Sequence, residues 1–223
     1  LSLHDALPIW DDHDYGRNDA GRGFEAREAS EAIFEEFWDV TGPATERPGV
    51  YRSAELELQG RTVGIVLLDT RFFRSPLPIA RPRPAGKGPY GVTTSGTILG
   101  DEQWEWLERE LRRPADLRIV ASSIQVLAEH HGWESWANFP HERDRLLALL
   151  AASDTPTVIV SGDRHCAEIS EYPLAPASST GAGTGRPPTI VDVTSSGINR
   201  CYSEETPTSN DRRTGGYYLG HNV

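Results

Sequence analysis

The 223-residue sequence has no methionine and only two cysteines, Cys166 and Cys201. Two cysteines are too few for a disulfide-rich scaffold, and they could pair or stay free. No run of about 18 apolar residues is present, which excludes an ordinary membrane-spanning helix. Basic residues are the minority charge, with 22 Lys and Arg against 33 Asp and Glu. The net charge of −11 argues against binding nucleic-acid duplexes through a basic face.

Two motifs of common enzyme classes are also missing. No Gly-x-Ser-x-Gly sequence is present, so the nucleophile elbow of serine hydrolases is unsupported. No Gly-x-x-x-x-Gly-Lys sequence is present either, which disfavours a phosphate-cradling P-loop. The apolar fraction of 37% is nevertheless large enough for a sizeable core.

Both ends of the sequence are unusual. Residues 1–9 (LSLHDALPI) carry no signal-peptide pattern, and we interpret them as a non-native leader. Residues 216–223 stop before a helix or strand is completed. We therefore expect one domain over residues 10–223, shortened at both ends.

Alternating apolar patterns predict a layered α/β fold. Three amphipathic segments predict helices over residues 25–38, 100–113 and 140–152. In the second of these, Asp101 is the expected N-cap, and Trp104, Leu107 and Leu111 form one apolar stripe. Five segments predict strands, over residues 51–58, 61–69, 117–126, 157–161 and 189–195. Residues 75–95 and 178–188 are rich in Pro, Gly or Ser and predict loops.

The first candidate site is an acidic segment near the N-terminus. Asp11, Asp12, His13 and Asp14 are consecutive, and Asn18 follows shortly after. Three carboxylates and an imidazole this close repel or crowd one another unless a cation lies among them. Carboxylate and amide oxygens suit hard cations, and imidazole suits transition metals. The alternative is an acidic turn in which Asp and Asn serve turn and capping chemistry.

The second candidate site follows the predicted strand over residues 157–161. Asp163 and His165 are two positions apart, so they share one side if the segment is extended. Ligands of α/β proteins gather at the carboxyl ends of strands, which makes these two residues a candidate metal pair. The alternative is a strand-ending turn with a histidine that is satisfied by neighbouring groups.

Arg71 follows the predicted strand over residues 61–69. Its guanidinium could clamp a phosphate through two hydrogen bonds. An ion pair with Asp69 or Glu102 is the structural alternative.

Polar and aromatic residues follow the predicted strand over residues 117–126. Ser122 and Ser123 are weak candidates for a nucleophile. Trp133, Trp136 and Phe139 could line a substrate mouth, but we favour a packing role for them.

Taken together, these segments resemble the PhoD-like alkaline phosphatases of the calcineurin-like metallophosphoesterase superfamily. Any one of the motifs is weak, whereas their order and spacing are specific. The resemblance is carried by residues 10–16 (WDDHDYG), 68–71 (LDTR), 99–104 (LGDEQW), 122–125 (SSIQ), 132–134 (GWE), 138–143 (NFPHER) and 161–165 (SGDRH).

The resemblance implies a four-layer α/β/β/α sandwich, here incomplete at the N-terminus, with a multi-metal site at strand ends. It implies hydrolysis of small phosphate mono- or diesters by metal-activated water. Iron and calcium are the metals associated with PhoD-like members, and manganese or zinc serve other members of the superfamily. The family is often exported, so the resemblance implies a periplasmic or secreted protein.

The same resemblance implies roles for individual residues. The implied metal ligands are Asp12, Asn18, Asp163 and His165, with Asp11 as a further choice. His13 is the implied catalytic helper beside the leaving group, and Arg71 is the candidate phosphate clamp. The family's upstream Cys and Asp motifs are not present in this sequence. A non-catalytic cation-binding or interaction domain with an incomplete site is therefore the alternative function.

Overall fold

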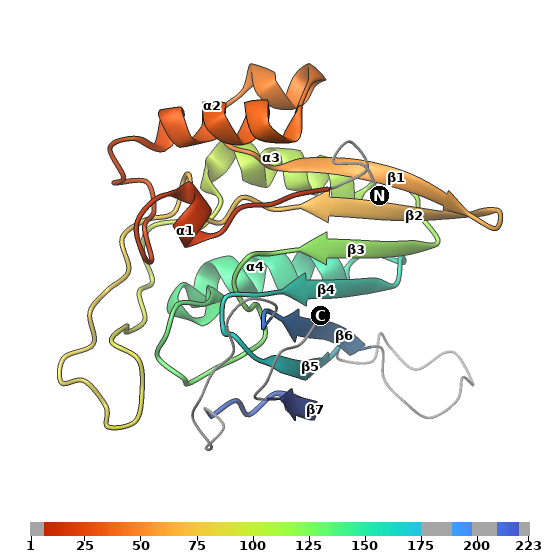
Figure 1. Cartoon of the computed structure of the whole chain (residues 1–223). Coiled ribbons are helices and arrows are strands. Elements are labelled where there is room, and N and C mark those ends of the chain that lie inside the picture. The colour runs from red at the N-terminus through yellow and green to blue at the C-terminus, as the bar shows by residue number, and fades with distance from the viewer. Residues whose placement is uncertain (1–6, 175–188, 198–208, 219–223) are drawn as a thin grey trace, which may run out of the picture.

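The chain folds around one seven-stranded mixed sheet (Figure 1). The computed structural model describes residues 7–174, 189–197 and 209–218. The strands are β1 (Arg52–Leu58), β2 (Arg61–Leu67), β3 (Leu117–Ala121), β4 (Thr157–Ser161), β5 (Ala167–Pro173), β6 (Thr189–Ser195) and β7 (Arg213–Tyr218). The helices are α1 (Asp12–Tyr15), α2 (Arg27–Trp38), α3 (Gly100–Leu111) and α4 (Pro140–Ala151), with short 3-10 turns at Gly42–Glu46 and Trp136–Asn138.

The strand order is β1-β2-β3-β4-β6-β5-β7. Strands β2, β3, β4 and β6 are parallel, and β1, β5 and β7 join their neighbours antiparallel. The carboxyl ends of the four parallel strands therefore meet at one edge of the sheet, where the chain leaves each strand for a loop (Figure 1). In α/β sheets this is the edge at which ligands bind.

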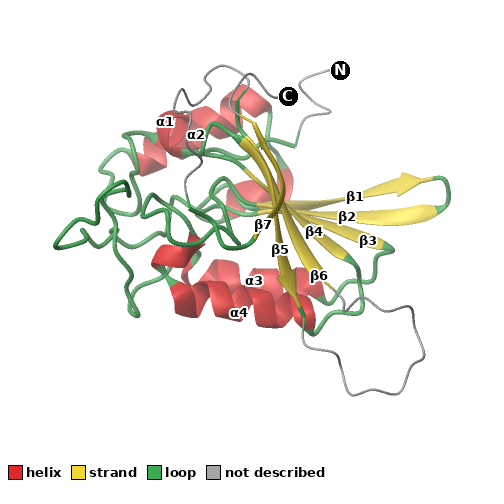
Figure 2. Cartoon of the chain, turned by 90° about the horizontal axis from the view of Figure 1, so that it is seen from below, coloured by secondary structure: helices red, strands yellow, loops and turns green. Residues whose placement is uncertain are grey.

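Helices α3 and α4 cover one face of the sheet (Figure 2). The predicted stripe of Trp104, Leu107 and Leu111 is confirmed, because all three side chains are buried in the main core. They pack in one cluster with Leu146 and Leu150 of α4 and with apolar side chains of β2, β3 and β4. Each such buried side chain stabilises the fold by roughly 1.5–3 kcal/mol.

The predicted mixed α/β architecture is confirmed, and all eight predicted elements are present with small shifts of their ends. The described residues supply one sheet and its helical layer of the four-layer sandwich that the resemblance implies. No helix of the described residues is long and apolar enough to cross a membrane. The predicted loop over residues 178–188, Cys201 and most of the leader lie outside the described residues.

Two local predictions were wrong. Asp101 does not cap α3, because the helix begins at Gly100 and Leu99 is its N-cap. The strand predicted over residues 117–126 ends at Ala121, since the Ser122 hydroxyl donates to the Ile124 carbonyl at 2.7 Å and turns the chain. The sequence interpretation also missed α1, β5 and β7.

Cys166 is buried and forms no disulfide within the described part of the chain. Burial raises the pKa of its thiol to about 12, so the side chain is an inert apolar group at neutral pH.

Candidate active site at the strand ends

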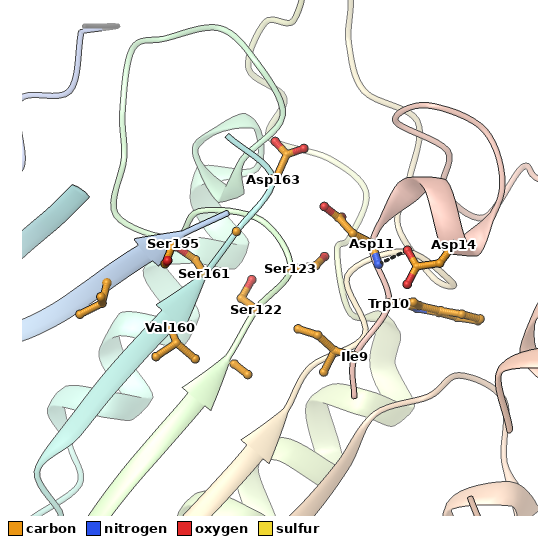
Figure 3. A pocket seen from close by; sticks show the side chains of 13 residues that line it. Ile9, Trp10, Asp11, Asp14, Ser122, Ser123, Val160, Ser161, Asp163 and Ser195 are labelled. Atoms are coloured by element: carbon orange, nitrogen blue, oxygen red, sulfur yellow. Dashed lines mark hydrogen bonds between the residues drawn. The ribbon is translucent and has the colours of Figure 1, made fainter. Parts of the chain in front are cut away.

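A pocket of about 440 Å³ lies at the carboxyl ends of the parallel strands (Figure 3). Its walls come from the N-terminal segment and from the ends of β3, β4 and β6. The lining residues are Ile9, Trp10, Asp11, Asp14, Ala121, Ser122, Ser123, Val160, Ser161, Gly162, Asp163, Val193 and Ser195. Figure 3 shows the carboxylates of Asp11 and Asp163 at the same end of this pocket, on segments more than 150 residues apart in the sequence.

Asp69 fixes the N-terminal segment to the end of β2. Its fully buried carboxylate accepts the indole N–H of Trp10 at 2.9 Å and the backbone N–H of Val50 at 3.0 Å. It also accepts the backbone N–H groups of Arg71 and Phe72 at 2.8 and 2.9 Å. Burial raises the pKa of Asp69, while these four donors oppose that shift. The carboxylate thereby holds Trp10, and with it Asp11, beside Arg71.

Arg71 lies at the centre of a buried charge network. Its Nε donates to Asp11 at 2.9 Å, Nη2 also contacts Asp11, and Nη1 donates to Glu134 at 2.6 Å. Arg74 makes an ion pair with the other oxygen of Glu134 at 2.8 Å. Burial lowers the pKa of Arg71, but Glu134 and Asp11 outweigh it and keep the guanidinium charged.

Hydroxyl groups complete the surroundings of Asp11. The Thr70 and Ser123 hydroxyls form a hydrogen bond at 2.5 Å, and Ser123 lowers the pKa of Asp11. Ser122 accepts the indole N–H of Trp136 at 3.0 Å. The hydroxyls of both serines therefore form hydrogen bonds with neighbouring residues of the site. The packing role predicted for Trp136 agrees with its full burial.

The pKa values of Asp11 and Asp163 are both raised in this pocket. Burial is the main cause that raises the pKa of each. The negative charges of Asp11 and Glu134 raise the pKa of Asp163 further, whereas Arg71 lowers that of Asp11. Two carboxylates in one pocket are stabilised in their charged form when a cation lies between or beside them.

Other predicted site residues lie outside this pocket. Asp12 is buried in α1 and accepts the backbone N–H of Asp19 at 3.0 Å. Asn18 is exposed and donates to the Asp19 carboxylate at 2.7 Å, and His13 is exposed on α1. Their roles as ligands and as catalytic helper stay predictions.

The segment after β4 is not extended, so the condition under which Asp163 and His165 were expected to share one side is not met. Both residues have positive φ, 66° and 53°, and the backbone N–H of Arg164 donates to the Gly162 carbonyl at 2.8 Å. This tight turn sends Asp163 into the pocket, while the His165 backbone N–H donates to Ser196 at 2.7 Å. His165 is not among the lining residues of the pocket.

The ion pair expected as the structural alternative for Arg71 is present, but with other partners than Asp69 or Glu102. Its side chain pairs with Asp11 and Glu134, whereas Asp69 receives only its backbone N–H and Glu102 is not a partner in the contacts of Arg71. Glu134 was missed as a site residue. Its only sequence signal is its place beside Trp133 in the 132–134 motif, and nothing local indicates its pairing with two arginines 60 or more residues earlier.

The donor set fits a hard cation in part. Within residues 7–174, 189–197 and 209–218, no group of three or more His, Cys, Asp or Glu side chains could hold a metal ion. Asp11 and Asp163 nevertheless provide carboxylate oxygens, and Ser123 and Ser161 provide hydroxyl oxygens, around the same pocket. Oxygen ligands of this kind suit calcium and similar cations.

Comparisons with known proteins identify the family and the fold of the chain. The family model of the PhoD-like phosphatases matches residues 3–215. The chain belongs to the PhoD-like phosphatase family. A solved structure described as the structure of PhoD is similar to this PhoD-like chain with a TM-score of 0.60 at 20% sequence identity. No curated protein matches the chain.

The likeness to the solved PhoD structure shows the fold of the PhoD-like chain. It covers 84% of this chain and 39% of the solved one. The chain thus spans about two fifths of the length of that relative.

Proposed function

We propose that the chain carries the major part of a metal-dependent phosphatase site that hydrolyses small phosphate mono- or diesters. The observation that supports this most is the meeting of Asp11 and Asp163 in one pocket at the strand ends. Membership in the PhoD-like phosphatase family supports the reaction class of this proposal. An exported location belongs to the same proposal.

Asp11 and Asp163 would hold the cation in this site. A bound cation lowers the pKa of a water molecule and neutralises charge on phosphoryl oxygens. Phosphoryl transfer depends chiefly on positioning and on positive charge around the transferred group. Iron and calcium are proposed first, with manganese and zinc as further choices.

The residues around Asp11 have positioning roles in this proposal. Arg71 hydrogen-bonds its carboxylate and so fixes the direction of its oxygens. Glu134 keeps Arg71 charged and turned toward Asp11. A carboxylate whose orientation is already fixed by such hydrogen bonds loses little conformational freedom when it binds a cation. Arg71 as a direct phosphate clamp and His13 as a proton donor remain proposals.

The test is hydrolysis of a paired chromogenic monoester and diester by this chain and by a longer version that carries the upstream family motifs. Each is assayed in chelator and after separate addition of iron, calcium, manganese or zinc. Turnover that chelator abolishes and one metal restores is the expected result. Turnover that is indifferent to chelator and blocked by a serine-directed reagent would instead indicate a serine hydrolase.

One observation favours the second candidate function, a non-catalytic cation-binding or interaction domain. Three aspartates line the pocket, but among the described residues no group of three or more His, Cys, Asp or Glu side chains could hold a metal ion. Stoichiometric metal binding without turnover, in both the chain and the longer version, would establish this alternative.

A further inference from the structure

A second pocket, of about 310 Å³, lies beside the candidate site. It is formed by the segment over residues 84–92 and by the segment that leads into α4, and both lie beyond the carboxyl ends of β2, β3 and β4 (Figure 1). The lining residues are Pro84, Lys87, Gly88, Tyr90, Gly91, Val92, Glu129, His130, Gly132, Trp133, Ser135, Ala137, Asn138 and Pro140. None of them lines the first pocket.

The two segments are fastened to each other by backbone hydrogen bonds. Gly88 donates to the His131 carbonyl at 2.8 Å, and Tyr90 donates to the Gly132 carbonyl at 2.9 Å. A Cβ atom at Gly88 would lie 2.2 Å from the Gly132 carbonyl oxygen, so only glycine permits this approach. Asn138 adds a side-chain bond to the Gly91 carbonyl at 2.9 Å. The pocket is therefore part of the folded framework.

Two side chains connect the walls of this pocket to the candidate site. The Tyr90 hydroxyl donates to Asp19, whose backbone N–H donates to Asp12. On the other wall, the Trp133 ring lies 5.1 Å from the guanidinium carbon of Arg164, the residue next to Asp163. A group held in the second pocket thus contacts Tyr90 and Trp133, and Trp133 in turn contacts Arg164, the neighbour of Asp163.

The pocket's chemistry favours an uncharged organic group. Its apolar surface comes from the rings of Tyr90 and Trp133 together with Pro84, Val92 and Pro140. Its charges are of both signs, from Lys87 and Glu129. The Glu129 carboxylate already pairs with Arg143 at 3.0 Å and Arg212 at 3.1 Å. No single charge therefore dominates the lining.

The geometry points to this pocket as the subsite for the organic group of the substrate, a phosphate ester of a bulky, uncharged, ring-bearing alcohol. The inference rests on the proposed phosphatase function and names its substrate class. Pockets that hold small organic ligands have volumes of about 300–1,000 Å³. The volume of 310 Å³ is at the low end of that range, which suits a group of one or two rings.

The test introduces a larger side chain into the pocket at a lining position that is largely exposed. Val92 is 64% exposed, so Val92→Phe adds bulk to the pocket wall without disturbing the core. Leu58→Phe is the matched control, because Leu58 is 56% exposed at the end of β1 and does not line the pocket. Ala137→Phe approaches the same space from the opposite wall and provides a second variant. Thermal unfolding of all three checks that they fold.

Two readouts are used. The first is kcat/KM for 2-naphthyl phosphate and for ethyl phosphate. Val92→Phe and Ala137→Phe are expected to lower the naphthyl value about tenfold or more, since changes of one methylene in an apolar pocket alter kcat/KM by about 10- to 200-fold. The ethyl value is expected to change less than about twofold, and Leu58→Phe is expected to change neither. The second readout is calorimetric binding of 2-naphthol, which needs no turnover.

Equal losses for both esters, or unchanged naphthyl hydrolysis in both pocket variants, would overturn the subsite while leaving the phosphatase function in place. Naphthol binding that the pocket variants abolish, in a chain without any ester hydrolysis, would support an organic-group pocket and reject the phosphatase function. A chain that neither hydrolyses the esters nor binds naphthol would overturn both inferences.

Discussion

Trp10 donates its indole N–H to the buried carboxylate of Asp69 at 2.9 Å, across 59 positions of the sequence. The same carboxylate accepts three backbone N–H groups from the segments that flank the site. This one contact decides where Asp11 lies, because Asp11 follows Trp10 directly and Arg71 follows Asp69 by two residues. The site is therefore assembled by the core of the fold before any ligand binds.

Asp69→Asn should destabilise the chain. An amide places an NH₂ group against either the Val50 N–H or the three donors at the other oxygen, so at least one buried donor loses its acceptor. The expected loss is about 1–3 kcal/mol of unfolding free energy, measured by urea denaturation. Asp101→Asn is the control, because Asp101 is exposed in the first turn of α3. Equal stability of the two variants would contradict the role given to Asp69.

Glu134→Gln should be more damaging than a surface change of the same kind. Glu134 is 1% exposed and pairs with both Arg71 and Arg74, which are also buried. Removing its charge leaves the buried Arg74 without its ion-pair partner and leaves Arg71 with Asp11 alone, and the expected loss is about 3 kcal/mol. Glu108→Gln, which breaks the partly exposed pair with Arg145, should lose less than about 1 kcal/mol. Denaturant titration of both variants measures the difference, and similar losses would argue against a charge network at the site.

Glu31 gives a prediction for pH. Burial raises its pKa from 4.5 to about 7, although the Gly49 N–H donated to it opposes the shift. The folded state therefore binds more protons than the unfolded state between pH 4.5 and 7, and this group makes stability fall as pH rises through that window. Glu31→Gln removes the effect. After discount for partial exposure, it should stabilise the chain by about 1 kcal/mol at pH 8 and by nothing at pH 4. Thermal unfolding at the two pH values measures this, and a gain that is larger at pH 4 would contradict the sign.

Metal binding should stabilise the chain through Asp11 and Asp163. A ligand at about 100 times its dissociation constant adds about 2.7 kcal/mol to the stability of a protein that binds it only when folded. Calcium or iron should therefore raise the melting temperature of the unsubstituted chain after chelator treatment. Asp163→Asn and Asp11→Asn should lose most of this rise, and Asp154→Asn, which alters an exposed residue, should keep it. A rise that both pocket variants retain would place the cation elsewhere.

The sequence predicted the fold well because its patterns are local. The apolar run over residues 61–67 and the stripe that includes Trp104 and Leu107 each depend on spacing alone. Strands β5 and β7 were missed because their pattern is weak and half polar. Pairing with β6 gives β5 its place in the sheet, and pairing with β5 gives β7 its place.

The site was predicted less completely, for two physical reasons. The spacing of Asp163 and His165 indicated one side only for an extended chain, and positive φ at both residues breaks that condition. Asp11 was only a second choice as a ligand after Asp12, and its importance comes from Arg71, which is 60 residues away in the sequence. Contacts of this kind depend on the tertiary fold, and no local pattern encodes them.

The most direct test of the account is phosphate release by the metal-loaded chain, extended by the upstream motifs of the family, compared with the Asp163→Asn variant of the same protein. The account predicts a loss of about 100-fold or more in kcat/KM, since even residues behind a metal ligand affect affinity or activity by about 10- to 100-fold. Asp154→Asn should hydrolyse the ester like the unsubstituted protein. Near-normal turnover by Asp163→Asn would contradict the claim that Asp11 and Asp163 form the catalytic metal site.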